Sequence, residues 1–138
     1  MQPQVMINTR PQDAYRRQDI LTANSVDLIV MLYDALKKNI ILGKRGIAKK
    51  DTQAAHKHLM KAQDIVSELM KSLDMNYEIS DELLSIYSFA LRNLAEANVK
   101  KDAAPLEPVL EMVEDLRSAW KEVSGQNKGN MQWREELA

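Results

Sequence analysis

The sequence predicts an all-α protein, specifically an antiparallel four-helix bundle with a short extra N-terminal helix. Apolar residues recur at three- and four-residue spacing over four long stretches, and no stretch keeps the alternation of a strand. Gly and Pro are scarce, with four of each in 138 residues, which favours long helices with short connections. Helices joined in this way pack antiparallel. A chain of this length can bury one core without disulfides, and it contains no Cys.

The first helix is expected from about residue 25 to residue 49. Asn24 can cap the free N–H groups of its first turn, and Asp27 is a carboxylate near the positive helix end. Two adjacent apolar stripes cover a combined arc of roughly 200°, whereas a surface helix turns about 100° toward a core. The first stripe consists of Leu28, Met31, Leu32, Ala35, Leu42 and Gly43, and the second of Ile29, Tyr33, Leu36, Ile40 and Ile47. We expect the first stripe to face the core and a partner to cover the second.

The second helix is expected from Asp51 or Thr52, either of which can cap it, to about residue 74. Its single narrow apolar stripe, which includes Leu59, is typical of a helix that packs on a core. The two histidines, His56 and His58, lie here two residues apart and so point to different faces. They cannot chelate one metal ion from a helix, and we interpret His58, at the edge of the stripe, as structural or solvated.

The third and fourth helices are predicted from their capping residues. Ser80 can cap the third, which has acidic residues in its first turn and is expected to end near Lys101. The fourth is expected to begin near Pro105, or at Pro108, and to end at Gly125. Four helices with these bounds complete the bundle.

The predicted domain organisation has one folded unit and two flanking segments. Residues 1–24 are expected to be a mobile segment, in which Pro11 can open one short capping helix. Residues 25–125 form the bundle, and residues 126–138 form a flexible tail. No apolar run approaches the ~20 residues that span a bilayer, and the N-terminus has no signal-peptide core. We therefore expect a cytoplasmic protein without membrane insertion.

The sequence offers little for catalysis. It has no Cys, no Gly-x-Ser-x-Gly elbow, no Gly-rich phosphate loop and none of the Glu-x-x-His pairs of a di-iron bundle. We expect no enzyme activity, no catalytic residue, no metal and no cofactor. The formal net charge is −1, and a local basic cluster between Lys37 and Lys50 suits the negative end of the first helix. Nucleic acid is therefore not expected as a partner.

A protein-binding module is favoured instead. Met occurs eight times and Phe once, and unbranched Met side chains suit surfaces that accept an apolar helix. From the pattern alone, a second copy of the chain covers the surplus stripe equally well, which leaves a homodimer open. A helical adaptor or dimerisation module for another protein is the alternative function.

Several short motifs follow one another in a defined order. They are Ala14-Tyr15, Thr22-Ala23-Asn24-Ser25, Met31-Leu32-Tyr33-Asp34, Glu96-Ala97-Asn98 with Asp102, and Ala119-Trp120-Lys121. Together they resemble the flagellar secretion chaperone family, FliS, over about residues 14 to 123. No piece is specific alone, but their order and spacing in an all-helical chain make the match strong. The family often has Pro at Ser25 and Gly at Ala35, and both differences keep the helix.

The resemblance implies a protein without catalysis that binds the disordered C-terminal segment of flagellin in the cytoplasm. Such a chaperone keeps flagellin from polymerising before export. It also helps to deliver flagellin to the membrane export gate of the flagellar type III secretion apparatus. This role would explain the surplus apolar surface, because a disordered segment needs a long apolar surface on which to fold.

The resemblance also implies an apolar groove that the N-terminal segment partly covers when the client is absent. From the wide arcs of the first and third helices, we expect the groove residues to be Ile29, Tyr33, Leu36, Ile40, Leu84, Ile86 and Phe89. The capping residues are expected to be Tyr15 and Ile20, although Gln12 replaces a second tyrosine that is common in the family. Leu28, Leu32 and Leu59 are assigned to the core.

Three polar or aromatic residues have two interpretations each. Asn39 and Asn98 are expected to bond neighbouring helices rather than the client, because buried amides need partners. Trp120 is expected to anchor the core rather than to contact the client. Replacing Ile29 or Leu36 by Asp is expected to abolish client binding while helical content stays intact.

Overall fold

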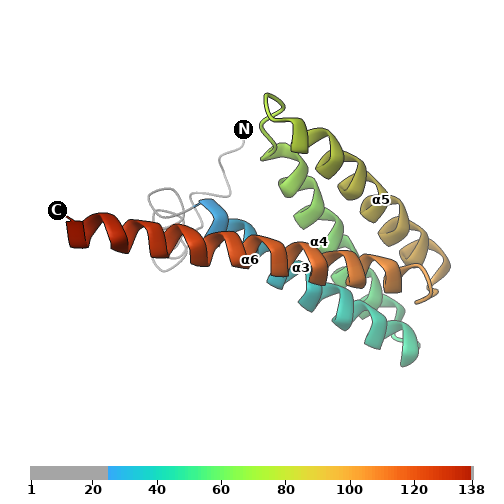
Figure 1. Ribbon diagram of the computed structural model, residues 1–138. Coiled ribbons are helices and arrows are strands. Elements are labelled where there is room, and N and C mark those ends of the chain that lie inside the picture. The colour runs from blue at the N-terminus through green and yellow to red at the C-terminus, as the bar shows by residue number, and fades with distance from the viewer. Residues whose placement is uncertain (1–24, 138) are drawn as a thin grey trace, which may run out of the picture.

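The computed structural model describes residues 25–137, with side chains from residue 26 to residue 123. This part of the chain forms four helices, α3 (Ser25–Ala48), α4 (Thr52–Lys71), α5 (Glu78–Lys100) and α6 (Leu106–Leu137). Successive helices run in opposite directions through short connections, and the described residues contain no strand (Figure 1). The predicted all-α bundle is confirmed. The predicted N-terminal helix and the predicted cap Asn24 lie outside the described residues.

Helices α3 and α4 lie where the sequence predicts them. Asp51 caps α4, because its side chain accepts a hydrogen bond from the backbone N–H of Ala54 at 3.1 Å. Lys50, just after α3, has a left-handed conformation with a φ of 58°. The two helices approach closely at Gly46, where an added Cβ would lie 2.7 Å from the backbone nitrogen of Ala55. A side chain at Gly46 would therefore push the helices apart.

Helix α5 begins earlier than predicted, because Ser80 does not cap it. The helix starts at Glu78, with Tyr77 in the capping position. The chain already turns at Asp74, whose carbonyl oxygen accepts hydrogen bonds from the backbone N–H of Tyr77 and from the hydroxyl of Ser80. The buried hydroxyl of Ser80 thus closes the preceding turn, and Ser80 itself lies inside the helix, three residues after Tyr77. The predicted cap at Ser80 is wrong.

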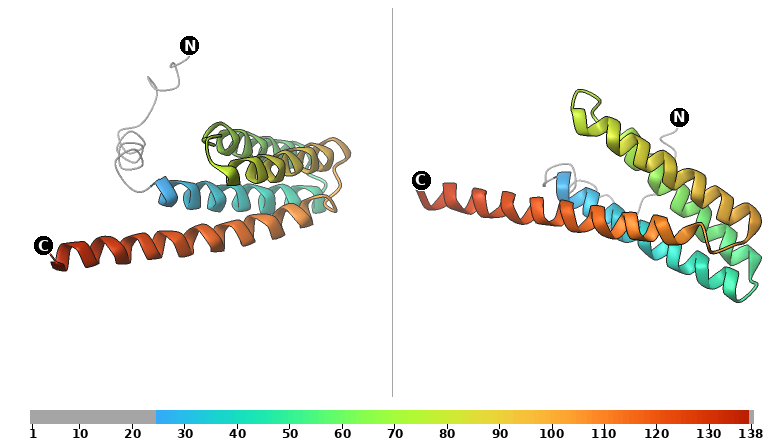
Figure 2. Two further views of the ribbon diagram at one scale, coloured as in Figure 1. Left: turned by 45° about the horizontal axis from the view of Figure 1, so that its top comes forward. Right: turned by 45° about the vertical axis from the view of Figure 1, so that its right-hand side comes forward.

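Helix α6 continues through Gly125 to Leu137, so the predicted end at Gly125 is wrong. Gly often ends a helix in a positive-φ conformation, and none of the glycines in the described residues has one. Gly inside a helix costs only about 1 kcal/mol relative to Ala, and no Pro follows it in this chain. Pro108 lies in the first turn of α6, where a missing N–H breaks no helical bond. Figure 2 shows α6 extending beyond the other helices.

The core is formed by one face of each helix. Helix α3 packs between α4 and α6, and α4 packs on α5, while the contact between α5 and α6 is the smallest of the four. The largest fully buried side chains are Tyr33, Tyr87, Leu36, Ile40, Leu59, Leu69, Leu94, Leu106, Val66, Val109 and Val113. Complete burial of a Leu-sized side chain stabilises the fold by about 1.5–3 kcal/mol. Within the described part of the chain, no helix is both long and apolar enough to cross a membrane.

Two buried amides join neighbouring helices. Asn39 of α3 donates to the carbonyl oxygen of Ala35 at 2.8 Å, and its own oxygen lies 3.2 Å from Nδ1 of His58 on α4. Asn98 of α5 lies 3.1 Å from Nδ1 of His56 on α4. Such bonds satisfy buried amides and fix the alignment of adjacent helices. These contacts support the structural interpretation of both amides and of His58.

Candidate protein-binding site

The second apolar stripe of α3, which was predicted to face a client, is buried more deeply than the first. Tyr33, Leu36 and Ile40 are all 0% exposed and belong to the core, whereas Met31, expected to face the core, is 41% exposed. Helical spacing defines the angle between two stripes but does not define which stripe faces the neighbouring helices. Because completely buried side chains cannot line an open groove, the predicted division between core and client stripes is wrong. Leu36→Asp would place a charge in the core and unfold the protein, contrary to the prediction of intact helical content.

The remaining groove residues predicted on described helices are more accessible. Ile29 is half-buried and packs against the core. On α5, Leu84 and Ile86 are half-buried, and Phe89 is 37% exposed. The wide apolar arc predicted for the third helix therefore does place apolar side chains at the surface.

The other predicted residues can be placed only in part. Leu59 is completely buried and Leu32 is half-buried against the core, as predicted for core residues, whereas Leu28 is half-buried outside the core cluster. The predicted capping residues Tyr15 and Ile20 lie outside the described residues. Their role stays a prediction.

An apolar hollow of about 350 Å³ lies between α5 and α6, and we call it the α5–α6 trough. The two helices diverge from their connection (Figure 2), and their mutual contact is the smallest in the bundle. The trough is lined by Ile86, Pro108, Glu111, Met112, Asp115 and Leu116. Its wall on α5 is Ile86 alone, and the other five lining residues belong to α6. Helix-in-groove recognition uses an apolar surface of this kind.

A buried hydrogen bond between two tyrosines links α3 and α5. The hydroxyl groups of Tyr33 on α3 and Tyr87 on α5 lie 2.6 Å apart. Burial raises the pKa of both tyrosines above the ordinary value of 10. Both hydroxyls are therefore neutral at physiological pH. Trp120 packs against the core, which supports its predicted role as a core anchor.

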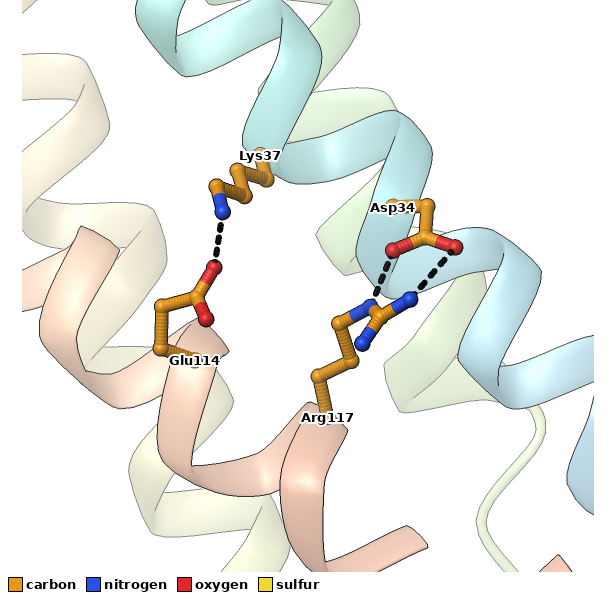
Figure 3. A network of polar contacts seen from close by, with 4 residues as sticks. All are labelled: Asp34, Lys37, Glu114 and Arg117. Carbon is orange, nitrogen blue, oxygen red and sulfur yellow. Dashed lines mark hydrogen bonds and ion pairs between the residues drawn. The ribbon is translucent and has the colours of Figure 1, made fainter. Parts of the chain in front are cut away.

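The opposite edge of α6 is held to α3 by ion pairs, and we call this contact the α3–α6 seam. Its ion pairs are Asp34–Arg117, Lys37–Glu114 and Lys44–Glu107. Figure 3 shows the first two, with the guanidinium of Arg117 turned toward both carboxylate oxygens of Asp34. The hydrogen bond with Asp34 also raises the pKa of Arg117. Glu107 and Glu114 of α6 are thus each neutralised by a lysine of α3.

A second hollow of about 350 Å³ lies between α3 and α4, and we call it the α3–α4 hollow. Its lining residues are Leu32, Lys57, Met60, Lys61, Asp64, Ile65 and Glu68. Charges of both signs surround its apolar centre. By contrast, both charged residues of the α5–α6 trough are acidic.

The described residues show no arrangement for metal chemistry. They contain no group of three or more His, Asp or Glu side chains placed to hold a metal ion. His56 and His58 instead lie within hydrogen-bond distance of amides on different neighbouring helices. Both imidazole rings are therefore engaged in contacts within the bundle.

The sequence prediction missed the α6 side of the trough. A signal was present, because Pro108, Met112 and Leu116 recur every four residues beside the core stripe of Val109 and Val113. That spacing puts the three residues on one edge of the helix. What the pattern did not reveal is that α5 leaves this edge uncovered.

Comparison with known proteins identifies the family. A family model described as "Flagellar protein FliS" matches residues 6–127, which is most of the chain. The chain belongs to the FliS family. The resemblance inferred from the short sequence motifs is confirmed.

FliS proteins of several bacteria are similar to this chain. The flagellar secretion chaperone FliS of Bacillus subtilis is 36% identical over 112 residues, covering 81% of this chain and 84% of the relative. The flagellar secretion chaperone FliS of Salmonella typhimurium is 29% identical over 108 residues, covering 76% and 80% of the two chains. The FliS of Vibrio cholerae is also 29% identical, over 116 residues, covering 80% and 85%. FliS is a family of chaperones and not a known family of enzymes.

Proposed function

We propose that this chain is a cytoplasmic flagellar export chaperone that binds the disordered C-terminal segment of flagellin in the α5–α6 trough. Membership of the FliS family supports the export chaperone role, since the similar proteins are named flagellar secretion chaperones. The observation that carries the placement of the client is the apolar surface that diverging α5 and α6 leave between them. Of the predicted groove residues, Ile86 lines this surface directly.

A pre-formed surface suits a disordered client. A segment that folds on binding loses about 2–5 kcal/mol to ordering and buries about 1,000–3,000 Å² in return. A rigid receptor adds little to that ordering cost. The trough is rigid because the opposite faces of its two helices are fixed in the core, with Leu94 of α5 and Val113 of α6 completely buried. The client segment can therefore fold onto helices that are already in place.

Binding alone accounts for the proposed role in export. A flagellin segment held in the trough is not free to contact other flagellin subunits, so premature polymerisation is prevented. The complex is then delivered to the membrane export gate, where flagellin is released. This function involves no catalysis.

Calorimetric titration of this chain with flagellin monomer of the same bacterium tests the proposal. We expect binding by full-length flagellin and by its isolated C-terminal segment, and no binding by flagellin that lacks this segment. Equal binding by the truncated flagellin would show that the client site on flagellin is different. Absence of binding by the full-length protein would contradict the proposed function.

The alternative is a helical adaptor or a homodimer in which a second copy of the chain covers the trough. Light scattering at several protein concentrations distinguishes it. We expect that any dimer formed without flagellin dissociates when the C-terminal segment is added, because both would occupy the same surface. A dimer that persists at saturating segment would favour the alternative.

A further inference from the structure

The rim of the α5–α6 trough carries two carboxylates that have no charge partner among the described side chains. Glu111 and Asp115 are exposed residues of α6, and both line the trough beside its apolar side chains. Within residues 26–123, neither side chain makes an ion pair or a hydrogen bond. Glu114, between them in the sequence, is instead paired with Lys37 across the α3–α6 seam. The trough therefore combines apolar side chains with uncompensated negative charge.

We propose that Glu111 and Asp115 select the client by charge, so that the segment held in the trough carries a Lys or Arg beside its apolar anchors. This inference rests on the proposed function and adds a property of the client segment. The two carboxylates are one helical turn apart, about 6 Å along the axis of α6. A single cation between them can contact both.

Desolvation explains why such a cation is needed. A segment that fills the trough removes water from the two carboxylates, and desolvating a charge is unfavourable unless an opposite charge replaces the water. A purely apolar segment leaves this loss uncompensated, and an acidic segment adds repulsion. A basic residue at the rim compensates it and also fixes the register of the segment in the trough. The two carboxylates therefore discriminate by charge among segments that are equally apolar.

The test is the affinity of the flagellin C-terminal segment for the charge-reversed variant E111K/D115K, measured by calorimetry at low salt and at 0.5 M NaCl. We expect about tenfold weaker binding at low salt, since attraction is replaced by repulsion at two rim positions. The difference from the original chain should shrink at high salt. Both residues are exposed, so circular dichroism should show unchanged helical content.

The chain offers a matched control in D64K/E68K. Asp64 and Glu68 are also exposed, are also four residues apart, and line the α3–α4 hollow instead of the trough. Reversing them changes the net charge by the same amount. We expect binding close to that of the original chain. Equal weakening by both variants would attribute the effect to net charge and overturn the inference.

The outcomes separate this inference from the proposed function. If the original chain binds the segment and E111K/D115K binds it equally well, the charge selection is wrong while the chaperone function stands. If the original chain does not bind the segment at all, the proposed function fails and the inference fails with it.

A reversed client provides the complementary test. The same flagellin segment is prepared with its Lys and Arg residues replaced by Glu. We expect this segment to bind E111K/D115K more tightly than it binds the original chain. A preference for the original chain would overturn the inference.

Discussion

The two edges of α6 carry the same kind of residue and differ in what lies opposite. On the edge facing α3, Glu107 and Glu114 are paired with lysines, and the contact is closed. On the edge facing α5, Glu111 and Asp115 line an open hollow with apolar side chains around them. One helix thus serves the α3–α6 seam on one side and the α5–α6 trough on the other. The difference shows that the partner helix, rather than the composition of α6, decides which edge is structural and which is free to bind.

The connection between α5 and α6 helps to explain why one edge stays open. The side-chain amide of Asn93 on α5 donates a hydrogen bond to the carbonyl oxygen of Pro105, just before α6, at 3.1 Å. This bond holds the two helices together where the chain passes from one to the other. Farther along, each helix packs on its other neighbour, α4 or α3. The gap between them becomes the trough.

The largest expected effect is on the free energy of unfolding, and it distinguishes a core position from a trough position. Leu36→Ala should lower the free energy of unfolding by about 2–5 kcal/mol, because it leaves a cavity at a completely buried position. Ile86→Ala, in the half-buried wall of the trough, should cost about 1 kcal/mol or less. Urea unfolding followed by circular dichroism measures both. Similar losses at the two positions would contradict the distinction.

The second effect concerns the hydrogen bond between the hydroxyls of Tyr33 on α3 and Tyr87 on α5. Tyr33→Phe should destabilise the fold by about 1–3 kcal/mol, because it leaves the buried Tyr87 hydroxyl without its bond. The double variant Y33F/Y87F should be less destabilised than the sum of the two single variants. Tyr77→Phe, at an exposed tyrosine, is the control and should have little effect. Additive losses would show that the two hydroxyls do not depend on each other.

Alkaline pH should lower the contribution of Tyr33 and Tyr87 to the free energy of unfolding. Burial raises the pKa of Tyr33 and Tyr87 in the folded state above the value of about 10 expected when unfolded. Above pH 10 the unfolded state has therefore lost tyrosine protons that the folded state keeps. The contribution of each tyrosine is complete below pH 10 and falls by up to about 1.4 kcal/mol for each further pH unit. Urea unfolding between pH 9 and pH 11 should show this decrease, and Y33F/Y87F should show a shallower one.

The smallest effect compares the acidic residues of the two edges. Glu114→Gln removes the ion pair with Lys37 and should cost about 0.2–1 kcal/mol at low salt, with less effect at high salt. Glu111→Gln removes no ion pair among residues 26–123 and should leave stability unchanged. Thermal unfolding at two salt concentrations measures both variants. A larger loss for Glu111→Gln would mean that the trough carboxylate stabilises the bundle.

The sequence predicted the helices better than it predicted their faces. The bundle and the bounds of α3 and α4 follow from periodicity and from the cap at Asp51. The sequence pattern could not predict which side of α3 faces the core, because both stripes are apolar. Only the positions of α4 and α6 decide between the two stripes. Tyr33 was a further indication that the second stripe is buried, since a polar hydroxyl on an apolar stripe can bond a buried partner on another helix.

The remaining differences come from contacts that local sequence does not reveal. Ser80 is a good capping residue by type, but its hydroxyl closes the turn at Asp74 instead. Gly125 is a common helix end, but the helix continues through it. The α5–α6 trough depends on two helices that diverge, which only the tertiary structure shows. Its α5 wall at Ile86 was nevertheless among the predicted residues.

The most direct test of trough binding is the affinity of the flagellin C-terminal segment for two variants with one new charge each. Ile86→Asp puts the charge in the α5–α6 trough, and Met60→Asp puts it in the α3–α4 hollow, where Met60 is 40% exposed. We expect Ile86→Asp to weaken binding about 30-fold or more, since it replaces a central apolar contact, and Met60→Asp to leave it nearly unchanged. Unimpaired binding by a folded Ile86→Asp variant, or equal loss in both variants, would contradict the assignment of the client to the trough.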